Sequence, residues 1–286
     1  MKKNLTLING KFKDSISVFD RGLAYGDGFF ETMQWIGKKN ESLKGVEFWN
    51  RHFKRITKSA KILKINIPNK NIFADYKKKI LTAAQKEGLY KGILKIIITR
   101  GVGGRGYSYE SNMKPTIIFI VFPNAPSKII ESVNVKICKS TISNNPDISG
   151  LKHLNRLDSV NARSEWKNKK IFEGIFIDNK KNILEGTMTN IFFVKNKSLV
   201  TPSIISSGIK GIMREVVLVY GKKFFNEVII REIRKHEIEN FEEMFLTNSI
   251  IKVLPVKKFG KKKFSISNST MELINFFQKI KNLEIA

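Results

Sequence analysis

Hydrophobic and polar positions along the first half of the chain follow two different periods. Over residues 48–63 and 71–87, apolar side chains recur every three to four positions, which predicts two amphipathic helices. Four runs rich in β-branched and aromatic residues instead predict strands, at 5–9, 29–36, 92–99 and 115–122. Because these helices and strands are interleaved, we expect a mixed α/β domain over residues 1–122.

The second half repeats this mixture in a different order. Short apolar runs predict strands at 133–138, 174–178, 183–186, 190–194 and 198–201, and further strands near Val228 and Met244. The closely spaced runs between 174 and 201 suggest an antiparallel meander. Helical patterns are expected from Lys152 to about residue 169, from the 208–214 segment to about 225, and from Ser269. We therefore expect a second α/β domain over residues 131–286.

The segment between these halves contains a Pro-Asn-Ala-Pro sequence at 123–126. Two prolines stiffen a chain without allowing it to continue a helix or a central strand, so residues 123–130 are expected to be an interdomain linker. The fold class predicted from the pattern as a whole is α+β, with two α/β subdomains.

Composition adds mainly exclusions. The formal net charge is +27, but the lysines are scattered along the whole chain instead of forming a stripe or a tail, so we expect no nucleic-acid partner. No apolar run is long enough for a membrane span, and the N-terminus lacks the apolar core of a signal peptide. Cys138 is the only cysteine and is expected to be a small core residue. These features predict a soluble, cytoplasmic protein without a metal site.

Two residues stand out chemically. Lys152 follows a Pro/Gly-containing loop, at the expected start of a helix, where the helix dipole would disfavour its cationic form. Glu185 lies in a strand-rich, apolar segment. On their own, a lysine at a helix start and a glutamate beside a glycine are ordinary surface residues. Together, they could supply an amine that forms a Schiff base and a carboxylate that pairs with a protonated pyridine nitrogen.

The sequences around these two residues carry a family resemblance. Lys152-His-Leu-Asn-Arg-Leu157 and Glu185-Gly-Thr-Met-Thr-Asn-Ile-Phe192 resemble the fold-type IV enzymes that use pyridoxal 5′-phosphate (PLP). The resemblance implies the fold shared by D-amino acid and branched-chain aminotransferases, with PLP as cofactor. It also implies that Lys152 bonds to PLP, that Glu185 contacts the ring nitrogen, and that the protein is a homodimer.

The same resemblance implies the residues that hold the cofactor phosphate. Gly208-Ile-Lys-Gly-Ile-Met-Arg214 is similar to the family's phosphate-binding turn, so the backbone N–H groups of Ile212 and Met213 are expected to donate to the phosphate. Ser249 matches a family hydroxyl that reaches the same group. Arg55 matches the arginine of a His-x-x-Arg-Leu motif, and its guanidinium suits a phosphate contact.

A third group of residues distinguishes the subfamilies. Gly103-Gly-Arg-Gly-Tyr107 places Arg105 between glycines, and the resemblance implies that Arg105 binds a substrate carboxylate in the neighbouring subunit's site. Phe30 stands where D-amino acid aminotransferases have a tyrosine, and it is expected to contact the substrate. Leu157 stands where branched-chain aminotransferases have a tyrosine. All three positions resemble the aminodeoxychorismate lyases.

The activity implied is conversion of 4-amino-4-deoxychorismate to 4-aminobenzoate and pyruvate, a step of folate biosynthesis. The alternative within the family is an aminotransferase acting on D- or branched-chain amino acids. An alternative of another class is a basic nucleic-acid-binding protein that has kept the fold and lost catalysis; steep salt dependence of nucleic-acid binding would identify it.

Overall fold

The computed structural model describes residues 4–37, 45–123 and 131–279. Contacts divide the chain into two units, of which the first takes in the N-terminal strands and helices together with Lys152–Asn155. The second unit includes the rest of the described chain. Apart from Pro123, which ends a strand, the expected linker lies outside the described residues.

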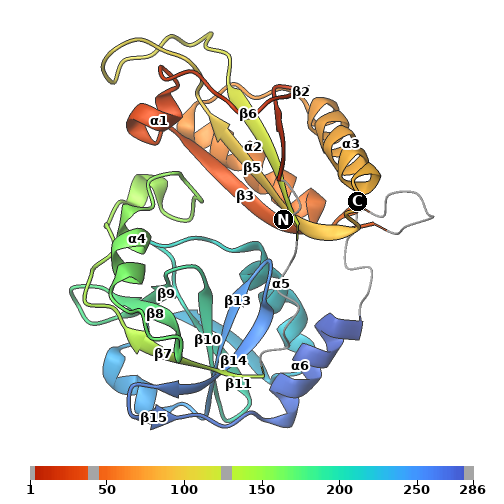
Figure 1. The fold of residues 1–286 in the computed structure, drawn as a ribbon. Coiled ribbons are helices and arrows are strands. Elements are labelled where there is room, and N and C mark those ends of the chain that lie inside the picture. The colour runs from red at the N-terminus through yellow and green to blue at the C-terminus, as the bar shows by residue number, and fades with distance from the viewer. Residues whose placement is uncertain (1–3, 38–44, 124–130, 280–286) are drawn as a thin grey trace. The chain divides into compact units, whose positions relative to one another are not determined.

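The first unit is built on a six-stranded antiparallel sheet (Figure 1). Its strand order is β2-β1-β6-β5-β3-β4. The strands are β1 (Leu5–Ile8), β2 (Lys11–Phe12), β3 (Gly28–Ile36), β4 (Gly45–Val46), β5 (Lys91–Thr99) and β6 (Thr116–Pro123). Helices α2 (Trp49–Leu63) and α3 (Lys70–Lys86) pack on this sheet, whereas α1 (Arg21–Tyr25) is a single turn that precedes β3.

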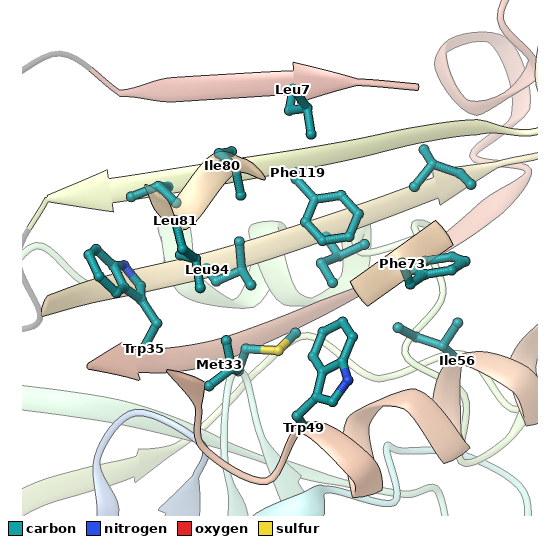
Figure 2. Close-up of a cluster of buried hydrophobic side chains, with 14 of the residues drawn as sticks. Leu7, Met33, Trp35, Trp49, Ile56, Phe73, Ile80, Leu81, Leu94 and Phe119 are labelled. Carbon is teal, nitrogen blue, oxygen red and sulfur yellow. The ribbon is translucent and has the colours of Figure 1, made fainter. Parts of the chain in front are cut away.

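The core of the first unit lies between the sheet and the two long helices. Alternation along β3 buries Met33 and Trp35 on the helix side, where Trp49 of α2 and Phe73 of α3 pack with them (Figure 2). Burying each of these large side chains contributes roughly 1.5–3 kcal/mol. The opposite face of the sheet carries the partly buried positions of β3, among them Phe30.

The second unit contains a nine-stranded mixed sheet with the order β12-β11-β10-β13-β14-β7-β8-β9, and β15 pairs with β14. The strands are β7 (Val133–Ile137), β8 (Ile171–Ile177), β9 (Ile183–Gly186), β10 (Asn190–Lys195), β11 (Ser198–Pro202), β12 (Glu227–Arg231), β13 (Glu243–Asn248), β14 (Lys252–Phe259) and β15 (Lys262–Lys263). The helices are α4 (Leu157–Ser164), α5 (Ile212–Tyr220) and α6 (Asn268–Lys279), with short 3-10 turns at Pro146–Ile148, Gly221–Lys223 and Lys235–Asn240.

One expectation about this unit is wrong. The runs at 183–186 and 190–194 do form strands, but β9 pairs only with β8, whereas β10 lies between β11 and β13. The meander is therefore broken between β9 and β10. The intervening turn is instead closed by a hydrogen bond from the Gly186 N–H to the Thr189 carbonyl, 2.8 Å.

The predicted helix start at Lys152 is also wrong. Lys152 lies in an extended segment, because the Phe30 N–H donates to its carbonyl (2.9 Å) and the Leu154 N–H donates to the Gly28 carbonyl (3.0 Å). Helix α4 begins five residues later, at Leu157, and is shorter than predicted. Backbone pairing with β3 has overridden the local amphipathic pattern. Lys152 is therefore not at the N-terminus of a helix.

Two further features bear on the expectations. Cys138 is 4% exposed and packs with Ala162, Trp166 and Phe176, which confirms it as a core residue. Burial, followed by the negative charges of Glu165 and Glu173, raises the pKa of its thiol to about 12. Among the described helices, none combines the length and the apolar composition needed to cross a bilayer.

Candidate active site

Lys152 lies against an aromatic ring of the first unit. Its Nζ is 4.4 Å from the centroid of the Phe30 ring, and the Nζ of Lys95 is 5.2 Å from the same centroid. An ammonium group near an aromatic face is attracted by the ring quadrupole. Two lysines from different segments therefore converge on Phe30, which the sequence had indicated as a substrate contact.

Lys95 is a residue that the sequence reasoning missed. It lies on β5, between the fully buried Leu94 and Ile96, so alternation turns it toward the face of the sheet that also carries Phe30. The signal was present in the sequence: Lys95 is a charged residue that interrupts the apolar run from Ile93 to Ile98. Such a residue is expected to face a polar surface or a ligand.

Glu185 is a buried carboxylate in the second unit. It is 5% exposed on β9, and its Oε2 accepts hydrogen bonds from the Ile209 N–H (2.8 Å) and from Asn190 Nδ2 (3.3 Å). Asn190 Nδ2 also donates to the Ile209 carbonyl, 2.9 Å. The carboxylate is thus fixed in place by neighbours on two other segments, and it is not the solvated turn residue that its glycine neighbour would suggest.

Two arginines add positive charge near Glu185. Burial lowers the pKa of both Arg156 and Arg214, while the charge of Glu185 acts on each in the opposite direction. Arg214 also donates through Nη2 to the Pro202 carbonyl, 2.9 Å. Glu185 is thus the carboxylate whose charge acts on both of these buried arginines.

The start of α5 lies beside the same carboxylate. Its N-cap is Gly211, and no side chain in the described part of the protein caps the helix. The first amides of any helix have no intrahelical acceptor, and here they include those of Ile212 and Met213. A Cβ on Gly211 would lie 2.1 Å from Asn190 Oδ1, so only glycine fits there. Asn190 therefore touches both Glu185 and the turn that opens α5.

Ser249 lies in the turn between β13 and β14. This turn is ordered by Asn248, whose Oδ1 accepts from the N–H groups of Ile250 and Ile251, both at 2.9 Å. Thr247, the residue before the turn, pairs in register with Asn190 across β13 and β10. Ser249 therefore follows the end of β13 that pairs with Asn190. Of the predicted residues, Glu185 and the start of α5 at Ile212 and Met213 are linked through Asn190.

Arg55 belongs to the first unit and forms an ion pair with Glu31. Its Nε and Nη2 each lie 2.6 Å from one carboxylate oxygen of Glu31, and His52 Nδ1 lies 2.6 Å from Glu31 Oε2. Burial alone would raise the pKa of Glu31, but Arg55 and His52 together hold it at about 2. The guanidinium of Arg55 thus faces a carboxylate of its own unit in this structure.

Arg105 is exposed in the loop between β5 and β6. Within the described residues, the structure gives its guanidinium no hydrogen bond and no ion pair. A Cβ added to Gly104 or Gly106 would meet nothing within 4 Å, so the chain on both sides of Arg105 has open space around it. The side chain is therefore available for an anionic ligand.

The arrangement defines a class of enzyme, and the chain belongs to it. A family model for class IV aminotransferases matches residues 28–259, and the fold is that of the fold-type IV enzymes. We therefore assign the chain to the class IV aminotransferase family.

Individual relatives carry two kinds of name. A Methanocaldococcus jannaschii protein, provisionally assigned as a branched-chain-amino-acid aminotransferase, is 34% identical over 87% of this chain and 85% of its own. The aminodeoxychorismate lyase of Vibrio harveyi is 28% identical over 87% of this chain and 89% of its own. The crystal structure of 4-amino-4-deoxychorismate lyase from Pseudomonas aeruginosa matches with a TM-score of 0.87 and 28% identity, covering 97% of this chain and 100% of that one.

Family membership makes PLP the cofactor, and the residues present fit it. A buried carboxylate with fixed geometry suits a protonated pyridine nitrogen, and the uncapped start of a helix suits a phosphate dianion. Gly208 adopts φ +91°, and a Cβ there would lie 3.2 Å from the Glu185 carboxyl carbon. The backbone consequently passes close to the carboxylate without a side chain in the way.

Proposed function

We propose that the protein is an aminodeoxychorismate lyase, which converts 4-amino-4-deoxychorismate to 4-aminobenzoate and pyruvate. The observation that carries this proposal is the pair of lysines on Phe30, with Nζ distances of 4.4 Å for Lys152 and 5.2 Å for Lys95. If Lys152 is the reacting amine, Lys95 is a second cation beside it. A substrate with two carboxylates uses that cation, whereas the apolar side chain of a branched-chain amino acid does not.

The proposal includes a role for each cofactor-binding residue, which its surroundings and the family resemblance support. Before the substrate arrives, Lys152 would hold the cofactor, and Glu185 would keep a proton on the ring nitrogen. Once the substrate amine has taken the place of Lys152, the Lys152 amine would be free to act as a base. The phosphate would be bound by the N–H groups of Ile212 and Met213, by the Ser249 hydroxyl and by the guanidinium of Arg55. Bound PLP supplies an electron sink for negative charge that develops on the substrate carbon bearing the amine.

The chemical step is then a proton transfer followed by an elimination. Lys152 Nζ removes the proton from C4 of the substrate, and the electron pair left behind expels the enolpyruvyl oxygen from C3. The departing group takes up a proton and leaves as pyruvate, and the ring becomes aromatic as 4-aminobenzoate. Atoms and electrons balance without an amino acceptor. Arg105 and Lys95 bind the substrate carboxylates, while Phe30 packs against the ring.

We also propose that the protein works as a homodimer. Five exposed apolar side chains form what we call the loop patch, and their exposed fractions are 56–84%: Val18, Phe19, Leu23, Val102 and Tyr107. The segments that carry them are joined by a hydrogen bond from the Gly103 N–H to the Phe19 carbonyl, 3.1 Å. Because the loop patch contains the loop of Arg105, a second copy that covers it would receive Arg105 next to its own substrate.

A direct assay tests the proposed reaction. The purified protein is supplied with PLP and with 4-amino-4-deoxychorismate generated in situ, and both products are quantified. We expect 4-aminobenzoate and pyruvate in equal amounts, and we expect Lys152→Ala to abolish both products together with the visible absorption of the lysine-bound cofactor. An unrelated surface variant, Lys169→Ala, serves as control and keeps full activity.

The branched-chain aminotransferase remains the second candidate because of the 34% identical archaeal relative. The same preparation is offered leucine or isoleucine with 2-oxoglutarate. Stoichiometric amino transfer, with no 4-aminobenzoate formed from the chorismate-derived substrate, would replace the lyase by an aminotransferase while keeping fold and cofactor.

A further inference from the structure

Arg21 is a buried arginine at the start of α1 that holds the loop carrying Arg105. Its side chain is 4% exposed. Nη1 donates to the carbonyls of Gly106 (2.9 Å) and Ser108 (3.2 Å), and Nη2 donates to the carbonyl of Tyr107 (3.1 Å). One guanidinium thus binds three successive carbonyls immediately after Arg105.

Aromatic residues complete this attachment. The Arg21 guanidinium lies 4.9 Å from the Tyr25 ring centroid, and the Tyr25 hydroxyl accepts a hydrogen bond from the Gly106 N–H, 3.0 Å. The rings of Tyr25 and Tyr107 pack at 5.5 Å. The Gly106 peptide is therefore held through both its N–H and its carbonyl, although Gly106 itself has φ +88° and no side chain to restrain it.

Asp27 fixes the orientation of Arg21. Its Oδ2 accepts from Arg21 Nε at 2.9 Å, and it also pairs with Arg100, which donates from Nε at 2.7 Å. Arg100 in turn binds the carbonyls of Leu63 and Lys64 at the end of α2. The loop is thereby connected, through Arg21 and Asp27, to a rigid helix of the same unit.

We propose that Arg21 is a positioning residue for the substrate's carboxylate: it does not touch the substrate, but it fixes residues 106–108 so that Arg105 is presented in one arrangement. This inference rests on the proposed role of Arg105. Glycines on both sides of Arg105 would otherwise let the loop sample many conformations, and ordering it on binding would cost affinity. Arg21 reduces that cost by ordering the loop in advance.

Arg21→Lys is the informative variant, because it keeps one positive charge beside Asp27 but cannot bind three carbonyls at once. We expect KM to rise by about tenfold while kcat changes by less than about twofold, the pattern of lost binding that is equal in ground and transition states. Arg163→Lys is the matched control, since Arg163 also binds a carbonyl (that of Trp166, 2.8 Å) and stacks on a ring, but in the other unit. Its KM should stay at the wild-type value.

A double-mutant cycle separates positioning from general structural damage. If Arg21 acts through Arg105, Arg21→Lys has no further effect on KM once Arg105→Ala is present. Effects that instead multiply in the double variant would overturn the proposal. So would a KM for Arg21→Lys within about twofold of wild type, because a tenfold rise corresponds to about 1.4 kcal/mol of lost binding.

Hydrogen exchange provides a readout that needs no assumed reaction. In Arg21→Lys, amides of residues 104–108 should exchange faster than in wild type, while those of α3 should be unchanged. Unchanged exchange at 104–108 overturns the proposal even if the enzyme is a lyase. A wild-type protein that produces no 4-aminobenzoate overturns the proposed function, and the exchange experiment still reports on the loop.

Discussion

At the scale of single residues, Glu31 shows how a charged side chain can be part of a buried core. Glu31 is 1% exposed on β3, in a position that alternation alone would give to an apolar residue. It is tolerated because His52 and Arg55 face both of its oxygens. A buried carboxylate of this kind supports the fold as long as it stays ionised.

This pairing predicts a loss of stability in acid. The pKa of Glu31 is about 2 in the folded protein and near 4.5 in the unfolded chain, so its contribution is complete above pH 4.5 and disappears as the pH falls toward 2. We expect Glu31→Gln to be destabilised by a few kcal/mol at pH 7 and by much less at pH 3. Urea titrations of both proteins across this range measure the difference; a pH-independent gap would contradict the ion-pair explanation.

Lys95 allows a second prediction at this scale. If it binds a substrate carboxylate, Lys95→Ala should raise KM by about 10–100-fold, since a charge-assisted hydrogen bond contributes about 1.5–3 kcal/mol. Lys91→Ala, on the exposed end of the same strand, is the control and should leave steady-state kinetics unchanged. Equal KM values for the two variants would remove Lys95 from the site.

At the scale of elements, the turn between β9 and β10 is organised by one buried acid. Glu173 of β8 is fully buried, and each of its carboxylate oxygens accepts one backbone N–H and one threonine hydroxyl. The donors are the N–H groups of Gly174 and Met188 and the hydroxyls of Thr187 and Thr189. Glu185 precedes this turn and Asn190 follows it. The Glu173 carboxylate therefore fixes the distance between Glu185 and Asn190.

Glu173→Gln should therefore destabilise the protein by about 1–3 kcal/mol, because its NH₂ group would face a backbone N–H that cannot turn away. Glu242→Gln is the control: this exposed glutamate accepts only long bonds of 3.3 Å from the Asn196 N–H, and its loss should cost less than about 0.5 kcal/mol. Guanidinium denaturation measures both variants. If they unfold at the same midpoint, the turn does not depend on Glu173.

The sequence predicted correctly those elements whose hydrophobic residues follow a clear local period. It failed where pairing with a distant segment determines the local structure. Helices α2 and α3 and strands β3 and β5 match their predictions to within about two residues, because their patterns reflect one buried face. The Lys152 segment resembled a helix locally but pairs with β3, and no local signal reveals such a partner. The 252–259 segment was not predicted as a strand, although β14 is central in its sheet.

The site residues likewise divide into those that the local sequence indicated and those whose contacts depend on distant segments. Lys152 and Glu185 were indicated by motifs that extend over several residues, and Glu185 is a buried carboxylate held by two hydrogen bonds. The engagement of Arg55 by Glu31 could not be foreseen, because the two residues are 24 positions apart and lie on different elements. Lys95 could have been found from the interruption of its apolar strand. Arg21 offered no signal, since its contacts with the loop are to backbone carbonyls.

At the scale of the whole molecule, charge and apolar surface act against each other. Each chain carries a formal net charge of +27, so two copies repel one another at long range. The loop patch provides the apolar contact that would have to overcome this repulsion. Added salt screens the charges over about 8–10 Å at physiological strength and leaves the apolar contact largely unaffected.

We therefore expect the proposed dimer to become tighter as ionic strength rises. Sedimentation equilibrium between 50 and 500 mM salt (about one decade, spanning the screening range) should show a falling dissociation constant. Phe19→Asp, in the centre of the loop patch, should give monomers at all salt concentrations, whereas Ile205→Asp, an equally exposed apolar residue of the second unit, should not. Dimers that persist in Phe19→Asp would place the interface elsewhere.

The burial of Cys138 has a practical consequence for following these events in solution. A thiol whose pKa is raised to about 12 presents almost no thiolate at neutral pH, so alkylating dyes will react with it only very slowly. A single exposed cysteine, introduced as Ser108→Cys, would then be the one labelled site on the chain without any need to remove the native residue. A fluorophore or spin label there would report, in real time, when the loop next to Arg105 meets a ligand.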